Sequence, residues 1–192
     1  MGNGLLPLLC LVAACASARK PVAPERVDLA RAEELVRAEI FRENPQMNPA
    51  AQFPLFEIEN AAAWESMSVQ LFQVGPGATT EACETFALRH GQVARLGTGF
   101  GGMGVGSTLV SDLDADGSPD LLFVYSWGSG RHRSQVGMLS IAGGALRTLP
   151  CEWSSDGDVF LVAAAGKAQL WNAQGPFASL RYSGGALSVV AE

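Results

Sequence analysis

The chain has 192 residues, of which 48% are hydrophobic and 17% are charged, and its formal net charge is −6. This length and apolar content suit a single compact domain and argue against a disordered chain. Acidic residues number 19 and basic residues 13, so the composition supplies no basic surface for nucleic acid, and no nucleic-acid partner is expected.

The N-terminus carries a mostly apolar stretch, residues 5–18, which is shorter than the roughly 20 residues of a membrane span. Polar residues beginning at Arg19-Lys20-Pro21 follow it, as in an export signal. Within the stretch, Val12-Ala13-Ala14-Cys15 resembles the lipobox of bacterial lipoproteins, in which the cysteine becomes the lipidated first residue of the mature chain. The resemblance implies a signal peptide and lipobox over residues 1–15, a lipid on Cys15, and a membrane-anchored location at the cell envelope. Ordinary cleavage near Ala14-Cys15-Ala16 is the alternative and would give a soluble secreted or periplasmic protein.

One helix is expected after a proline-containing tether over residues 16–27. Asp28 is a suitable N-cap for a helix that continues to about Glu43, and Asn44-Pro45 ends it. Glu33 and Arg37 are spaced to form an i,i+4 ion pair on this helix. Apolar residues at helical spacing predict an amphipathic helix packed on a sheet, with Leu29, Ala32, Val36 and Ile40 on or beside one face.

The remaining chain has the pattern of short strands separated by glycine turns. A first strand is predicted at 66–71 from period-two alternation, and paired strands are predicted at 84–90 with 92–96, 136–141 with 145–149, 158–163 with 167–172, and 178–182 with 186–190. Residues 28–192 are therefore expected to form one mainly β domain. Its predicted architecture is an antiparallel meander, either propeller-like or a sandwich, with the one N-terminal amphipathic helix at an edge.

The most specific chemistry lies in residues 112–120, Asp-Leu-Asp-Ala-Asp-Gly-Ser-Pro-Asp. Calcium requires six to eight oxygen ligands, and one short segment supplies them when alternate side chains converge. Gly117 permits the sharp turn that such convergence needs. An EF-hand would require a glutamate at the twelfth position, which is Phe123, and the apolar run that follows predicts a strand. The expected ligands are the side chains of Asp112, Asp114, Asp116 and Asp120 with the carbonyl of Ser118.

The pattern Asp-x-Asp-x-Asp-Gly-x-x-Asp-Leu between two strands resembles the calcium loop of FG-GAP and VCBS-type repeats, with Phe100-Gly101 upstream. The resemblance covers roughly residues 100–125, as a single copy, and implies the same five ligands and a bound calcium. It implies a β-rich module whose ion is structural, with a binding or structural role at the cell envelope. The envelope protein or glycan that would be its partner is not identified by the pattern.

Outside the signal region the chain has two cysteines, Cys83 and Cys151. An even pair in an oxidising compartment predicts a disulfide between them, with two separate buried thiols as the alternative.

Two further patterns concern activity. Gly97-Thr98-Gly99-Phe100-Gly101-Gly102 satisfies GxGxxG but opens no helix, so these glycines are interpreted as sites of close chain approach. The chain is expected not to be an enzyme. The alternative is an envelope hydrolase with His132 as general base, drawing on its polar neighbours Ser126, Ser129, Arg131 and Arg133. Spacing alone selects no carboxylate partner for His132.

Overall fold

The computed structural model describes residues 25–192 except 49, 51, 76–82, 98–102 and 128–131. The helices are α1 (Leu29–Glu43) and α2 (Ala61–Met67). The strands are β1 (Leu55–Ile58), β2 (Gln70–Val74), β3 (Glu84–Arg89), β4 (Gln92–Leu96), β5 (Gly104–Ser111), β6 (Asp120–Trp127), β7 (Arg133–Ala142), β8 (Ala145–Asp156), β9 (Phe160–Ala164), β10 (Lys167–Asn172), β11 (Gly175–Ser183) and β12 (Ala186–Ala191).

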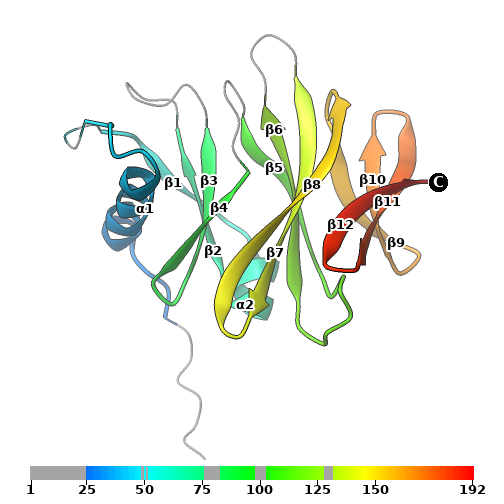
Figure 1. Ribbon diagram of the computed structural model, residues 1–192, viewed down its shortest axis with the longest axis horizontal. Coiled ribbons are helices and arrows are strands. Elements are labelled where there is room, and N and C mark those ends of the chain that lie inside the picture. Colours follow the sequence, from blue (N-terminus) through cyan, green and yellow to red (C-terminus); the bar gives the residue numbers. More distant parts are fainter. Residues whose placement is uncertain (1–24, 49, 51, 76–82, 98–102, 128–131) are drawn as a thin grey trace, which may run out of the picture.

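These strands form three antiparallel sheets of four strands each, and every sheet is a meander of strands consecutive in the chain: β1–β4, β5–β8 and β9–β12. The predicted mainly β meander is therefore confirmed. Figure 1 shows α1 and then the first, central and last sheets following one another across the molecule. The strand order within each sheet is that of a propeller blade.

Three apolar clusters hold these layers together. Ala32, Val36 and Ile40 of α1 pack on one face of the first sheet. The other face of that sheet, together with α2, packs against the central sheet, and the central sheet packs against the last sheet on its remaining side. The middle strands of the central sheet, β6 and β7, are thus buried on both faces.

The sequence of strand β6 reflects its burial on both faces. Leu121 and Phe123 belong to the cluster facing the first sheet, whereas Leu122 and Val124 belong to the cluster facing the last sheet. All four side chains are at most 3% exposed. A strand with two buried faces must be apolar at every position, which explains the continuous run that follows the aspartates.

The four predicted hairpins close at turns with two consecutive residues at positive φ. The pairs are His90-Gly91, Gly143-Gly144, Ala165-Gly166 and Gly184-Gly185. Two left-handed residues are the signature of the two-residue turn that matches the right-handed twist of paired strands. The glycines between the predicted strands therefore indicated these four hairpin turns correctly.

Helix α1 begins and ends close to the predicted residues. The side chain of Asp28 accepts a hydrogen bond from the Arg31 N–H at 2.8 Å, and Glu33 pairs with Arg37 at 2.9 Å. Leu29 departs from the prediction because its side chain is 53% exposed and contributes nothing to the packed face. It is the first residue of the helix, and the packed face of α1 begins at Ala32.

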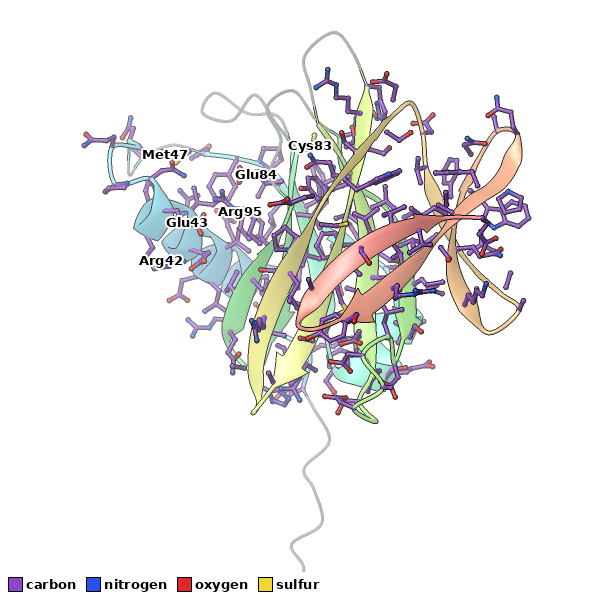
Figure 2. All side chains as sticks on the ribbon, turned by 45° about the vertical axis from the view of Figure 1, so that its right-hand side comes forward. Arg42, Glu43, Met47, Cys83, Glu84 and Arg95 are labelled. Atoms are coloured by element: carbon purple, nitrogen blue, oxygen red, sulfur yellow. The ribbon has the colours of Figure 1, made fainter. Side chains whose placement is uncertain are left out.

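An ion cluster joins the end of α1 to the first sheet. The Arg95 guanidinium lies 2.7 Å from Glu43 of α1 and 3.4 Å from Glu84 of β3, and Figure 2 shows the three side chains together. Burial raises the pKa of Glu84, since desolvation opposes its charge more than the nearby Arg95 favours it. This cluster fixes the helix against the sheet.

The helix α2 was not predicted, and the expected strand at 66–71 begins only at Gln70. Asn60 caps α2 by accepting a hydrogen bond from the Ala63 N–H at 2.9 Å, and three alanines follow. A cap followed by strong helix formers was a signal in the sequence. The strand predicted from period-two alternation is wrong at 66–69, because α2 continues to Met67 and Ser68, at positive φ, ends it.

The predicted disulfide is wrong, since Cys83 and Cys151 are both free thiols. Cys151 lies in the apolar cluster between the central and last sheets, whereas Cys83 directly precedes β3 of the first sheet. Burial raises the pKa of the Cys151 thiol, which makes it less reactive.

The predicted signal peptide, Cys15 and most of the tether lie outside the described residues. The end of the tether does contact the domain, since Val27 exchanges two hydrogen bonds with the Gln70 side chain at 2.8 and 3.1 Å. Among the described residues, no helix is both long enough and apolar enough to cross a membrane.

Gly137 offers a test of the packing between the first two sheets. It lies opposite Phe123 in the β6–β7 ladder, and a Cβ added at Gly137 would lie 2.3 Å from the Phe123 ring. We expect Gly137→Ala to lower the free energy of unfolding by about 1–3 kcal/mol, because the buried ring must move. Denaturant unfolding measures this change. Gly106→Ala is the control, since its added Cβ meets no atom within 4 Å, and equal stability of the two variants would contradict the packing.

Candidate functional site

The aspartate-rich loop connects β5 to β6 within the central sheet. Ser111 and Asp120 are paired across the ladder, so residues 112–119 form the connection between two antiparallel strands. The sequence prediction that the loop joins strands is therefore confirmed. In Figure 1 the loop lies at the lower end of this hairpin, where β6 enters the core.

Local backbone geometry turns the aspartates toward one another. Ala115 and Gly117 both have positive φ, of 59° and 87°. Asp114 accepts a hydrogen bond from the N–H of Asp116 at 3.1 Å, and Asp112 accepts one from the N–H of Gly117 at 3.1 Å. Such side-chain-to-backbone bonds hold short acidic residues in a compact turn.

Three of the predicted ligands converge. One carboxylate oxygen from each of Asp112, Asp114 and Asp116 lies within 4.8 Å of the others. Two oxygens that share one calcium ion at about 2.3–2.6 Å can be no more than about 5 Å apart. The spacing of these three carboxylates therefore fits a common cation. Asp112 and Asp116 are exposed, which leaves a route for the ion from solvent.

Asp120 does not belong to this group of three. Its side chain is 2% exposed, and its Oδ2 accepts a hydrogen bond from the Leu113 N–H at 3.0 Å, which fastens the two ends of the loop. Ser118 donates its N–H to Asp116 at 2.7 Å. Coordination by its carbonyl, and by Asp120, stays a prediction.

Burial of Asp120 opposes the charge on its carboxylate. The pKa of Asp120 is raised to about 6, chiefly by desolvation and further by the charges of Asp114 and Asp116. The hydrogen bond from Leu113 opposes this rise without cancelling it. A cation bound in the loop would favour the charged form of Asp120.

A second group of polar residues lies at the other end of β6. His132 Nε2 is 3.0 Å from Asp158 Oδ1, and His132 Nδ1 is 3.5 Å from Ser126 Oγ. Sequence reasoning named Ser126 and His132 but missed Asp158, because 26 residues separate it from His132 and no motif links them. Arg133 approaches Asp156 at 3.8 Å, and Ser129 and Arg131 lie outside the described residues.

The glycine-rich segment has its expected role at one described position. A Cβ on Gly97 would lie 2.3 Å from the Tyr125 ring, so this glycine allows close approach of chains. Gly99, Gly101 and Gly102, and Phe100 of the resemblance, lie outside the described residues.

Comparison of the chain with protein-family models, with curated proteins and with solved structures returned no significant match. The resemblance to FG-GAP and VCBS-type repeats consequently stays a prediction based on the loop residues.

The raised pKa of Asp120 predicts a pH dependence of stability in calcium-free protein. The folded pKa of about 6 exceeds the ordinary value of 3.8, so the folded state binds this proton more tightly than the unfolded state. The contribution of Asp120 to the free energy of unfolding is therefore fully present below pH 4, and it is lost as the pH rises through 6. The difference is about two pKa units, so the loss is at most about 3 kcal/mol.

We expect Asp120→Asn, in chelator, to gain stability relative to the parent chain as the pH rises from 4 to 7. The asparagine carbonyl can still accept from Leu113, and it carries no charge. Urea unfolding at several pH values measures the difference, with the exposed Asp156→Asn as control. A difference that stays constant with pH would show that burial does not raise this pKa.

Proposed function

We propose that the chain is an exported, lipid-anchored β-rich module of the cell envelope whose loop 112–120 binds calcium as a structural ion. The observation that carries the proposal is the convergence of the Asp112, Asp114 and Asp116 carboxylates within 4.8 Å in the connection that leads into β6. The module then serves a binding or structural role toward an envelope partner.

The donor set favours calcium among the common cations. All the predicted ligands are oxygens, which suits calcium or magnesium and disfavours the softer transition metals. A single flexible loop with carboxylates and a carbonyl matches the six to eight ligands of calcium better than the strict octahedron of magnesium.

A structural role for the ion follows from where the loop lies. Asp120 is the first residue of β6, and the next four residues are buried between two sheets. An ion that holds the loop closed therefore stabilises the register of the central hairpin. Four carboxylates also leave little coordination free for a substrate.

Export and lipidation rest on the N-terminal sequence. The Val12-Ala13-Ala14-Cys15 segment supplies the proposed anchor, and the proposed calcium loop suits an exported protein because extracellular calcium modules function with weak affinity, at Kd values of about 10⁻⁴–10⁻³ M.

Calcium is expected to raise the melting temperature of the full chain. An ion that binds only the folded state stabilises it by about 2.7 kcal/mol when its concentration is a hundred times Kd. We expect Asp114→Asn combined with Asp116→Asn to abolish this response, because two of the three convergent carboxylates lose their charge. Scanning calorimetry with excess calcium and with chelator measures both effects.

The matched control is Glu152→Gln, which removes a negative charge from an exposed position on β8 and should retain the full response to calcium. Superimposable melts of the parent chain with calcium and with chelator would reject the proposed ion.

The proposed anchor predicts a defined mature N-terminus. Expression of the full chain in a bacterium should yield a protein that begins at Cys15 and carries a lipid mass, and Cys15→Ser should remove that mass. Intact-mass spectrometry of the membrane fraction makes the measurement. An unmodified chain that begins at Ser17 or later would support simple secretion instead.

A further inference from the structure

A cavity of about 200 Å³ lies between the central sheet and β9, at the end of β6 remote from the aspartate loop. Apolar side chains make one part of its lining and a Ser, His and Asp make another. Its lining includes Met103, Gly106, Val124, Ser126, His132, Ser134, Asp158 and Phe160.

The polar part of this lining has the arrangement of a nucleophile, a base and an orienting carboxylate. Asp158 lies 3.0 Å from His132 Nε2, which favours the tautomer with its proton on Nε2. The lone pair of Nδ1 then faces Ser126 Oγ, 3.5 Å away. A nucleophile and base at this separation, with the base oriented by a third group, is the pattern of activated serine sites, which are often looser without substrate.

Two backbone contacts hold Asp158 in this position. Gly157, at φ of 82°, donates its N–H to the His132 carbonyl at 3.0 Å. Its own carbonyl accepts the Ser134 hydroxyl proton at 2.8 Å. The turn before β9 is thereby clamped to the beginning of β7. Since Ser134 directs its proton to Gly157, Ser126 is the cavity serine that faces the base.

The His132–Asp158 pair contributes little to folding. The two side chains are 35% and 73% exposed, and contacts between side chains at such exposed positions stabilise a fold little. The clamp through Gly157 does not depend on either side chain. Both side chains can therefore be exchanged without loss of the fold, and both are accessible to a ligand.

The cavity also contains a candidate donor for a developing oxyanion. The β5–β6 register passes from Val105–Tyr125 to Ser107–Val124, so Gly106 is the extra residue of a bulge. A bulge leaves the backbone groups of its extra residue outside the ladder. Gly106 lines the cavity, and its N–H is suited to stabilise negative charge there.

We propose that Ser126, His132 and Asp158 form a site that hydrolyses small uncharged carboxylic esters. Ser126 Oγ bonds to the ester carbonyl carbon while its proton moves to His132 Nδ1, and Asp158 stabilises the imidazolium. The ester C–O bond then breaks, and the alcohol leaves with that proton. Water attacks the acyl group and gives a proton to His132, and the departing Ser126 oxygen takes that proton as the acid is released.

The cavity defines the substrate class. Its volume is below the roughly 300–1,000 Å³ of typical small-molecule pockets, so it suits a short acyl chain. Val124 is a buried apolar wall, and the exposed side chains of Met103 and Phe160 border the opening, so the lining disfavours a charged acyl group. This proposal does not depend on calcium binding at the distant loop.

The test uses the full chain and two probes. We expect turnover of p-nitrophenyl acetate and butyrate but not palmitate, and covalent modification of Ser126 by a fluorophosphonate. Ser126→Ala should abolish both, and His132→Gln should reduce turnover by about 10²–10⁴-fold, the usual contribution of a general base. Asp158→Asn should also reduce turnover. Ser188→Ala, at an exposed position on β12, is the matched control and should react as the parent chain does.

Gly106→Val tests the cavity separately from the base. Its added Cβ meets no atom within 4 Å and Gly106 lacks a positive φ, so the fold should be retained while a valine adds bulk to the cavity lining. We expect an unchanged melting temperature and a greater loss of butyrate than acetate turnover. Ester turnover that does not depend on Ser126, or no turnover at all, would overturn the proposal whether or not calcium stabilises the protein.

Discussion

The burial of β6 and β7, the middle strands of the central sheet, on both faces is the constraint on which the molecule depends. Leu121 and Phe123 of β6 pack toward the first sheet, and Leu122 and Val124 pack toward the last. A shift of one residue in register would exchange the two sets of side chains between two cores of different shape. Gly137 of the neighbouring strand leaves the space that the Phe123 ring occupies, so this strand too is fitted to one register.

An acidic loop directly before such a strand places two physical demands in conflict. Apolar burial requires Asp120 to enter the protein at 2% exposure, where desolvation and the charges of Asp114 and Asp116 oppose its ionisation. The Leu113 N–H relieves only part of this cost. Convergence of three further carboxylates adds repulsion that a single divalent cation would reverse. These opposed demands are the physical reason for proposing a counter-ion in the loop.

Local patterns were predictable from sequence, and contacts between distant segments were not. Consecutive left-handed turn residues such as His90-Gly91 specify a hairpin within four residues, and alternate aspartates specify a converging loop. Helix α2 was missed although Asn60 and the alanines after it were a local signal. The free thiols of Cys83 and Cys151, and the approach of Asp158 to His132, follow from how whole sheets stack, which no spacing in the chain records.

The two ends of β6 present different chemistry on one rigid element. From Asp120 to Ser126 the strand spans roughly 20 Å, at about 3.3 Å per residue, so an ion in the loop is too far away to act on a substrate in the cavity. Both ends are nevertheless set by the same β5–β6 ladder. The loop closes that ladder at the Ser111–Asp120 pair. The bulge at Gly106 then shifts the pairing of the two strands by one residue before they reach the cavity. Because the buried side chains between them permit one register, the hairpin that carries the aspartates also determines where Ser126 meets His132.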